Sequence, residues 1–187
     1  MKIATHNSAT GEKAGSFLSW LLTPFAKCQS KTIKQQYEAG CRMFDIRIRW
    51  TNDEWHCAHG LWHTKRYASD ILHEINCFPK SCYVLITYEG KLKNEQDKKA
   101  LLSFCNWAKT AFPNIKFGDI AAKYVDDDTK VDWVILESGK VAKNKQGFLP
   151  LDGNHWQTYL PIPWLWKKLY FNKPKFDNKI YTFVDFL

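Results

Sequence analysis

Two histidines stand at the ends of segments that read as short β-strands. His6 closes the run 2–6 within MKIATHNSATG (1–11), and His59 lies in the run 55–61. A pair of imidazoles at strand ends suits general base and general acid work on a phosphodiester. One ring takes a proton from the attacking hydroxyl, and the other gives a proton to the leaving oxygen, each worth about 10²- to 10⁴-fold in rate. A single histidine taken alone is more often structural.

The stretch RMFDIRIRW (42–50) carries a stronger pattern, because its residues alternate between apolar and polar. One face of the strand is apolar, and the other carries Asp45, Arg47 and Arg49. An aspartate and an arginine on one inward row suit phosphate binding, since the planar guanidinium matches phosphate oxygens and the carboxylate orients it. The alternative is an internal salt bridge.

Strand-like and helix-like segments alternate along the whole chain, which predicts one α/β domain over 1–187. The patterns predict strands at 2–6, 42–50, 55–61, 83–88, 131–136 and 180–186. They predict helices at 31–39 with Ser30 as cap and Gly40 after the end, at 69–77 with Ser69 as cap, and at 94–111 with Asn94 as cap.

Polar residues suited to chemistry stand at the ends of several of these strands. They are His6, Asp45 with Arg47, His59, Glu89, Glu137 and Asp185. In a parallel barrel the carboxyl ends of all strands converge on one face, where active sites lie. This pattern favours a barrel over an open doubly wound sheet. Because 187 residues are few for eight full units, we expect a compact, distorted and incomplete TIM (β/α) barrel.

Three stretches together resemble the X domain of phosphatidylinositol-specific phospholipase C, especially the small bacterial form. They are THNSATG (5–11), SKTIKQQYEAGCRMFDIRIR (30–49) and AHG (58–60). The middle block is specific, and the resemblance covers about residues 3–90 and the last strand. It implies a distorted TIM barrel and a phosphodiesterase that cleaves a phosphoinositide. In that family the inositol 2-hydroxyl attacks phosphorus, diacylglycerol leaves and a cyclic inositol phosphate forms.

The resemblance also implies a role for each matching residue. His6 matches the general base, and His59 matches the general acid. Arg47 matches the bacterial arginine that stabilises phosphate charge, with Asp45 as its acidic companion. Asp185 on the last strand falls where the family has the aspartate that pairs with the base and fixes its tautomer.

The sequence departs from the bacterial pattern in two ways, one that bears on metal binding and one that bears on headgroup recognition. Asn7 stands where bacterial enzymes have Asp, and calcium-dependent relatives have Asn there and a carboxylate at the place of Glu89. An Asn7–Asp45–Glu89 calcium site is therefore the alternative to a cofactor-free enzyme. Arg47 stands where the calcium site needs an acid, and this favours metal independence. Glu89 and Glu137 replace basic headgroup residues, so we expect them to accept hydrogen bonds from sugar hydroxyls.

The basic balance of the chain favours an anionic partner, although solubility alone is the simpler explanation. Lys and Arg number 27 against 19 Asp and Glu, a net charge of +8. Aromatic residues mix with Lys in PIPWLWKKLYFNKPKF (161–176) and with bases in GLWHTKRY (60–67). Such segments suit a peripheral membrane surface, unless the tryptophans fill the core. No nucleic-acid-binding motif is present.

The start of the chain lacks the features of a signal peptide. Its longest apolar runs, such as 17–22, fall far short of the roughly 20 residues that span a membrane. We therefore expect a cytoplasmic monomer, or a secreted protein if a leader was trimmed. The six cysteines lack zinc-site spacing, and we expect reduced thiols.

Two other functions compete with a phosphoinositide-cleaving enzyme. The same chemistry could act on a soluble or non-inositol phosphodiester. An inactive X domain that only binds lipid is the non-enzymatic alternative, and it predicts at least one broken catalytic position. His6, Asp45, Arg47, His59 and Asp185 are all present, which favours the enzyme.

Overall fold

The computed structural model describes residues 3–51, 53–89 and 94–117 together with their side chains, and the backbone of residues 121–122, 132–135, 141–144 and 182–184. The strands are β1 (Ile3–Thr5), β2 (Cys41–Thr51), β3 (Glu54–His59), β4 (Trp62–Tyr67), β5 (Cys82–Tyr88), β6 (Ile115–Phe117), β7 (Ala121–Ala122), β8 (Asp132–Ile135), β9 (Val141–Asn144) and β10 (Thr182–Val184). The helices are the 3₁₀-helix η1 (Ser8–Gly11), α1 (Phe17–Ala26), α2 (Ile33–Glu38), α3 (Ala68–Asn76) and α4 (Glu95–Ala111).

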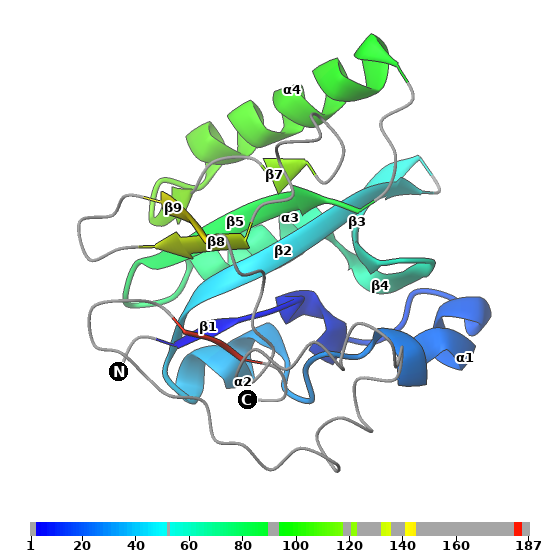
Figure 1. Ribbon diagram of the computed structural model, residues 1–187, viewed down its shortest axis with the longest axis horizontal. Helices are drawn as coiled ribbons and strands as arrows, with labels where there is room; N and C mark the ends of the chain where they lie inside the picture. The colour runs from blue at the N-terminus through cyan, green and yellow to red at the C-terminus, as the bar shows by residue number, and fades with distance from the viewer. Residues whose placement is uncertain are drawn as a thin grey trace.

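The long strand β2 is the centre of an eight-stranded sheet (Figure 1). It pairs in parallel with β1 on one edge and with β5 on the other. β10 pairs in parallel with β1, so the last described strand lies beside the first. β6 and β7 pair in parallel with β5. The α/β class is confirmed, whereas closure of this sheet into a barrel stays a prediction.

The strand expected at 55–61 is instead part of an antiparallel hairpin. β3 pairs antiparallel with β2, and β4 pairs antiparallel with β3. The strand itself is confirmed as β3, but its antiparallel pairing contradicts the parallel arrangement in which its end was expected to lie. The reason is the connection: only two residues separate β2 from β3, and a parallel pair needs a crossover of a dozen residues or more. Asp53 has φ 60°, as a tight turn requires.

The strand predicted at 131–136 is present as β8, but its pairing differs from the expected one. β8 pairs antiparallel with β9 in a separate two-stranded sheet. In the part of the chain that the structure describes, it has no pairing with the main sheet.

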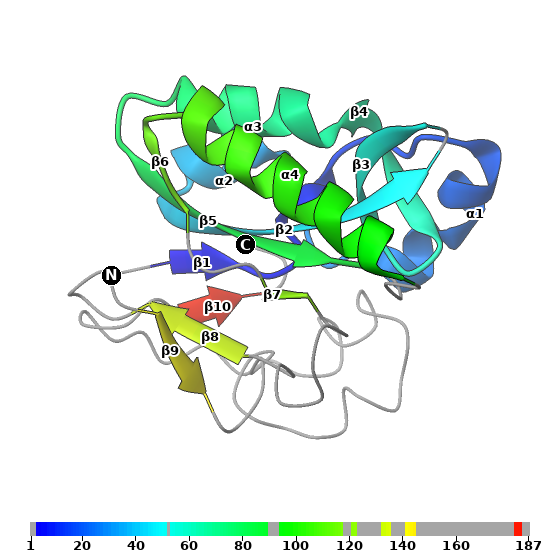
Figure 2. The same cartoon turned by 90° about the horizontal axis from the view of Figure 1, so that it is seen from above.

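Helices α3 and α4 lie on the same side of the main sheet (Figure 2). The apolar face of β2 points into the core on this side, and Phe44, Ile46 and Ile48 are fully buried. They share one hydrophobic cluster with residues of both helices, among them Ile71 and Leu101. The alternation predicted for β2 is thus confirmed, and it leaves Asp45 and Arg47 to face the opposite side of the sheet.

Local hydrogen bonds place two helix starts away from the predicted caps. α2 begins after Thr32, not Ser30, because Thr32 and Gln35 form a reciprocal capping box. α3 begins at Ala68, where Asp70 accepts a hydrogen bond from the backbone of Tyr67 at 3.3 Å. The Asn94 cap of α4 is confirmed by its 2.9 Å bond from the backbone N–H of Asp97.

Helix α1 follows η1 and has no counterpart among the sequence predictions. Its cap is Ser16, whose hydroxyl accepts from the Ser19 backbone N–H at 3.1 Å. Within the residues that the structure describes, no helix combines the length and apolar character that crossing a bilayer requires.

Candidate active site

The sheet brings its chemistry-bearing side chains together where β1, β2 and β5 end. His6 follows β1 directly, and the register sets Thr5 beside Phe44 of β2. On the other edge of β2, Arg47 is aligned with Thr87, and Glu89 follows the end of β5. The Glu89 backbone N–H donates to the carbonyl of Ile48 at 2.8 Å, which fixes where this carboxylate leaves the strand.

Arg47 is the hub of this cluster, because each of its three nitrogens meets a different partner. Nε donates to Asp45 Oδ2 at 3.1 Å, and Nη1 donates to Glu89 Oε2 at 3.3 Å. Nη2 lies 2.7 Å from Nε2 of His6. The guanidinium is therefore held in one orientation by two carboxylates. Both carboxylates raise the pKa of Arg47 against the effect of burial, so it stays charged.

Asp45 is fully buried beneath Arg47. Its Oδ2 also accepts the backbone N–H of Asn7 at 3.1 Å, and its Oδ1 accepts from Thr87 Oγ1 at 3.4 Å. Burial alone would raise its pKa, but Arg47 and His6 together hold the pKa of Asp45 below its ordinary value. The carboxylate is thus ionised and serves to orient Arg47.

The contact with Arg47 shows which hydrogen-bonding role Nε2 of His6 has. A guanidinium only donates hydrogen bonds, so Nε2 of His6 is the acceptor in the 2.7 Å contact. Asn7 Nδ2 approaches the same nitrogen at 3.4 Å, and Gln29 Nε2 donates to the His6 carbonyl at 3.0 Å. Asp185, the predicted partner of His6, lies outside the described residues.

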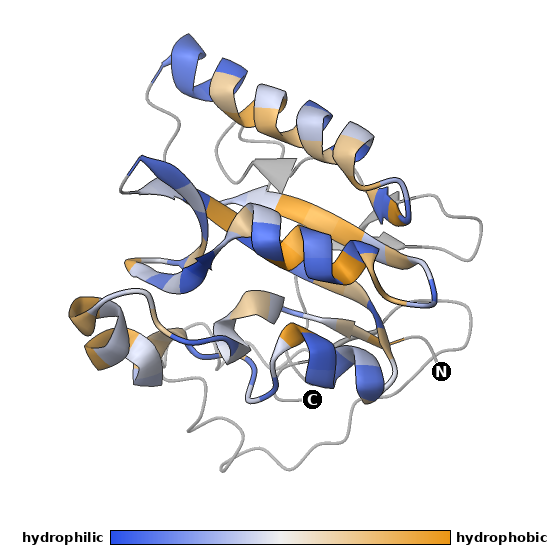
Figure 3. Ribbon diagram, turned by 180° about the vertical axis from the view of Figure 1, so that it is seen from behind, coloured by the Kyte–Doolittle hydropathy of each residue, from blue (hydrophilic) through white to orange (hydrophobic). Residues whose placement is uncertain are grey.

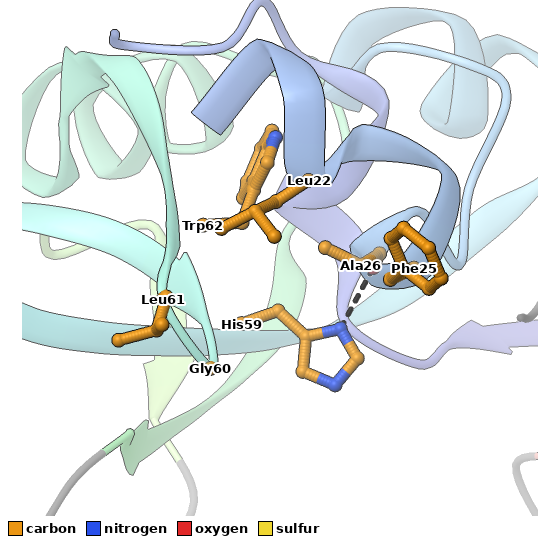
Figure 4. Close-up of a pocket in the computed structure, with 7 residues that line it drawn as sticks. All are labelled: Leu22, Phe25, Ala26, His59, Gly60, Leu61 and Trp62. Atoms are coloured by element: carbon orange, nitrogen blue, oxygen red, sulfur yellow. Dashed lines mark hydrogen bonds between the residues drawn. The ribbon is translucent and has the colours of Figure 1, made fainter. Parts of the chain in front are cut away.

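His59 ends β3 and faces the carboxyl end of α1 (Figure 4). Its Nδ1 lies 2.7 Å from the carbonyl oxygen of Ala26 and therefore carries the proton in this contact. Cys28 Sγ lies 3.9 Å from the same nitrogen. Burial and then the charge of Arg47 lower the pKa of His59, while the Ala26 carbonyl and Glu89 act in the opposite direction. With Nδ1 engaged, Nε2 is the nitrogen that can serve a ligand.

Glu89 connects the Arg47 cluster to the hairpin that carries His59. One carboxylate oxygen accepts from Arg47, and the other accepts the Gly60 backbone N–H at 3.2 Å. Gly60 is the residue after His59 and has φ +59°. Glu89 therefore sets the distance between the two halves of the site. The sugar-binding role predicted for Glu89 stays a prediction, and Glu137 lies outside the described residues.

Asn7 has a left-handed backbone, φ 45° and ψ 50°, which asparagine adopts more readily than most residues. Its side chain is buried, Nδ2 donates to Cys28 Sγ at 3.5 Å, and Oδ1 has no hydrogen-bond partner. Among the three residues of the predicted calcium site, Asn7 is thus the one whose side-chain oxygen is available to coordinate a cation.

The other two oxygen donors proposed for calcium, Asp45 and Glu89, are both paired with Arg47. The residues as arranged hold a guanidinium in this place and do not fit a calcium ion. Across the described ranges, no group of three or more His, Cys, Asp and Glu side chains is placed to hold a metal.

A pocket of about 260 Å³ opens beside His59 (Figure 4). Apart from His59 and Gly60, its lining is apolar and comes from α1, the hairpin tip and the start of β4: Leu22, Phe25, Ala26, Leu61 and Trp62. Arg49 donates to the carbonyls of Gly60 and Leu61, which holds the hairpin tip at the pocket edge. His59, the predicted general acid, thus faces an apolar pocket. The charged side chains of Asp45, Arg47 and Glu89 lie on the other side of the site.

Sequence reasoning missed several parts of this arrangement. The partner of His59 is a main-chain carbonyl, for which no side-chain signal exists. Cys28 and Gln29 lie in the loop after α1, and neither stands in a recognisable motif. The ends of the parallel strands, by contrast, did predict that His6, Asp45, Arg47 and Glu89 come together. His59 reaches them from the end of an antiparallel strand, which that reasoning did not foresee. Of the two segments predicted to contact a membrane, 161–176 lies outside the described residues, and for 60–67 the contact stays a prediction.

Comparisons with known proteins give the following similarities. No protein-family model and no curated protein matches the chain. The phosphatidylinositol-specific phospholipase C from Listeria monocytogenes has 19% identity and a TM-score of 0.44 over 59% of this chain and 40% of that one. The H258Y mutant of the enzyme from Staphylococcus aureus has 14% identity and a TM-score of 0.45 over 76% and 52%. The chain spans about half or less of these relatives' length, and both belong to the family that its sequence motifs resemble.

Proposed function

We propose that the chain is a phosphodiesterase similar to phosphatidylinositol-specific phospholipase C. In this proposal it cleaves a glycerophosphoinositide by attack of the inositol 2-hydroxyl and gives a cyclic inositol phosphate and diacylglycerol. The observation that carries the proposal is the Arg47 hub, in which one guanidinium contacts His6 and is fixed by Asp45 and Glu89. A buried cation beside a base suits an anionic phosphodiester whose neighbouring hydroxyl must lose its proton to attack phosphorus.

The base step uses Nε2 of His6. The 2-hydroxyl gives its proton to this nitrogen as its oxygen forms the new bond to phosphorus. Nη2 of Arg47 contacts Nε2 of His6. In this proposal a phosphate oxygen replaces Nε2 as the acceptor for Nη2, while Asp45 and Glu89 keep Nε and Nη1 in place. The guanidinium stabilises the charge that grows on the non-bridging oxygens. In the proposed mechanism, the Asp185 carboxylate accepts a hydrogen bond from the Nδ1–H of His6 and stabilises the charged ring.

The acid step uses Nε2 of His59. As the bond from phosphorus to the glycerol oxygen breaks, this nitrogen gives its proton to the leaving oxygen, and diacylglycerol departs. The Ala26 carbonyl holds the opposite side of the ring at 2.7 Å and directs Nε2 to the site. His6 ends with one proton more and His59 with one fewer, and exchange with water restores both. The apolar pocket beside His59 suits the apolar leaving group.

We also propose that the reaction needs no metal ion. The positive charge that calcium would supply is provided by Arg47, which is paired with both candidate carboxylate ligands. A divalent cation next to this guanidinium would be repelled. Added chelator is therefore expected to leave turnover unchanged.

Phosphorus NMR of phosphatidylinositol vesicles tests this function directly. We expect the wild-type protein to produce a cyclic phosphodiester signal, with and without chelator. His6→Ala and His59→Ala are expected to lose turnover by at least about 10²-fold each. Absence of turnover by the wild type, or full activity of either variant, would overturn the proposal. Turnover only with calcium would assign Asn7, Asp45 and Glu89 as ligands instead.

A second candidate keeps this mechanism but acts on another phosphodiester with a neighbouring hydroxyl. Both carboxylate oxygens of Glu89 accept hydrogen bonds within the protein, one from Arg47 and one from Gly60. This favours the second candidate, because Glu89 is a residue that we expected to bind the inositol ring. The same NMR assay with non-inositol and water-soluble diesters separates the two. Faster turnover of any of these than of phosphatidylinositol selects the second candidate.

A further inference from the structure

The side-chain hydroxyl of Thr10 makes three hydrogen bonds at once. Thr10 lies on η1, which sits between α1 and α2 (Figure 3). Its Oγ1 donates to the main-chain carbonyl of Asn7 at 2.8 Å and accepts the backbone N–H groups of Cys28 at 2.9 Å and Gln29 at 3.1 Å. A hydroxyl has one proton to give and two lone pairs that accept. These contacts therefore use its whole capacity, and Thr10 is only 2% exposed.

The segment 26–29, which runs from the last residue of α1 into the following loop, reaches both histidines proposed for catalysis. At its start, the Ala26 carbonyl oxygen lies 2.7 Å from Nδ1 of His59. At its end, Gln29 Nε2 donates to the His6 carbonyl at 3.0 Å. The segment 26–29 thus connects the proposed base to the proposed acid.

Cys28, inside this segment, also contacts the site through its sulfur. Asn7 Nδ2 donates to Cys28 Sγ at 3.5 Å, and the same sulfur lies 3.9 Å from Nδ1 of His59. Sulfur is a weak hydrogen-bond acceptor, and a thiol is a weak donor. The main-chain bonds from this segment to Thr10 are shorter and stronger, so they are the contacts that hold the segment 26–29 in place.

Without the Thr10 hydroxyl, two backbone N–H groups inside the protein lose their acceptor. Cys28 and Gln29 are both buried, so water does not replace the hydroxyl in the folded arrangement. A buried donor without a partner is costly, and the chain moves to give it a new one. A shift of the segment 26–29 carries the Ala26 carbonyl away from His59.

We propose that Thr10 is a positioning residue for His59 and His6, on which it acts through the segment 26–29. The roles of the two histidines rest on the proposed function. Once Nε2 of His59 has given its proton to the leaving oxygen, the ring keeps its remaining proton on Nδ1. The Ala26 carbonyl accepts a hydrogen bond from that nitrogen, so the tautomer that proton transfer leaves behind is already held. Thr10 is buried and contributes this without contact with the substrate.

Substitutions that separate the hydroxyl of Thr10 from its shape test this proposal. Thr10→Val keeps the shape and removes the hydroxyl, whereas Thr10→Ser keeps the hydroxyl and removes a methyl group. The matched control is Thr64→Val, because Thr64 is fully buried on β4 and its hydroxyl donates to the carbonyl of Arg66 at 2.6 Å. Circular dichroism and urea denaturation check that each variant folds.

Two measurements need no turnover. Amide hydrogen exchange follows the N–H groups of Cys28 and Gln29. Proton–nitrogen NMR of the imidazole rings gives the tautomer of neutral His59, with His59→Ala to assign its signals. In Thr10→Val we expect exchange at both amides to rise by at least about tenfold, because each loses a buried acceptor, and the share of the Nδ1–H tautomer to fall. Thr10→Ser and Thr64→Val are expected to keep wild-type values.

Turnover of a water-soluble inositol phosphodiester measures the catalytic consequence. We expect Thr10→Val to lower kcat by about 10- to 10²-fold and to leave KM within about twofold, because the groups that move act in proton transfer. Thr10→Ser is expected to keep kcat within about threefold of the wild type. A kcat that stays unchanged in Thr10→Val would remove the positioning role.

Unchanged exchange and tautomer in Thr10→Val, or equal changes in Thr64→Val, would overturn the proposal. If Thr10→Val does not fold, Thr10→Cys takes its place. Its thiol is a weak acceptor, so smaller changes in the same direction are expected, and wild-type values in this variant would also contradict the role of the hydroxyl. A wild type that turns over no phosphodiester sinks the proposed function, whereas the exchange and tautomer data still decide whether Thr10 positions the histidines.

Discussion

Arg47 and His6 are in direct contact, with 2.7 Å between Nη2 and Nε2. The nitrogen proposed to take the substrate proton is therefore covered by the side chain proposed to bind the phosphate. In the proposed mechanism, a phosphate oxygen that takes over the Nη2 hydrogen bond frees Nε2 of His6 when the substrate binds. Under this proposal the pair couples substrate binding to the availability of His6.

This coupling is measurable by chemical modification of His6. We expect diethylpyrocarbonate to modify His6 slowly in the wild type and severalfold faster in Arg47→Ala, because the guanidinium no longer covers Nε2. The same variant is expected to lose about 10²- to 10³-fold in kcat, since a fixed donor to the phosphate is removed. Peptide mass spectrometry gives the rate for each histidine, with exposed His73 as internal reference. Equal rates at His6 in both proteins would show that Arg47 does not cover it.

Removal of the Arg47 charge is also expected to destabilise the fold. Asp45 is fully buried, and Arg47→Met leaves its carboxylate without the cation that compensates it. We expect a loss of about 3–5 kcal/mol in the free energy of unfolding. Urea denaturation measures it, and Arg47→Met combined with Asp45→Asn is expected to recover part of the loss. The control Lys98→Met breaks an exposed pair with Glu95, which is worth about 0–1 kcal/mol.

Alternation along β2 made this buried pair predictable from the sequence. Residues two apart on a strand share a face, so Asp45 and Arg47 had to lie side by side once β2 was assigned. α1 was not predictable in this way, because its apolar residues point outward and its inward contacts are hydroxyls. The residue pattern of 55–61 fits both a hairpin strand and a parallel strand after a crossover. The tight turn at Asp53 selects the hairpin. The roles proposed for Glu137 and Asp185 stay predictions from the sequence.

The environment of His59 has a consequence for the pH dependence of kcat/KM. Burial and Arg47 lower its pKa from the ordinary 6.5. A general acid must hold its proton, so the rate falls as pH rises through this lowered pKa. We expect the alkaline limb of kcat/KM, which reports the free enzyme, to lie below pH 6.5.

Glu89→Gln sharpens this measurement, because the Glu89 charge acts to raise the pKa of His59. The variant is expected to move the alkaline limb to still lower pH. Glu95→Gln on exposed α4 serves as the control and leaves the limb where it is. An alkaline limb above pH 7 in the wild type, or no movement in Glu89→Gln, would remove His59 from the role of acid.

Two glycines test how closely the loop after His6 must pack. A Cβ built on Gly11 would lie 1.8 Å from the carbonyl oxygen of Lys31, and Gln36 Nε2 clamps the two segments through Ser8 and Lys31 at 2.8 and 2.7 Å. Because backbone atoms oppose the new methyl group, Gly11→Ala must shift η1. η1 follows His6 and Asn7 directly, so the shift displaces the base.

Gly60→Ala is the matched control, since Gly60 has φ +59° and nothing within 4 Å of the added Cβ. Gly60→Ala is therefore expected to lower the free energy of unfolding only through backbone strain, by about 1–2 kcal/mol. Gly11→Ala is expected to cost more, about 3 kcal/mol, and to lower kcat as well. Urea midpoints and turnover of both variants measure the difference. If both alanines cost the same and Gly11→Ala keeps its activity, the close approach of η1 to Lys31 does not position His6.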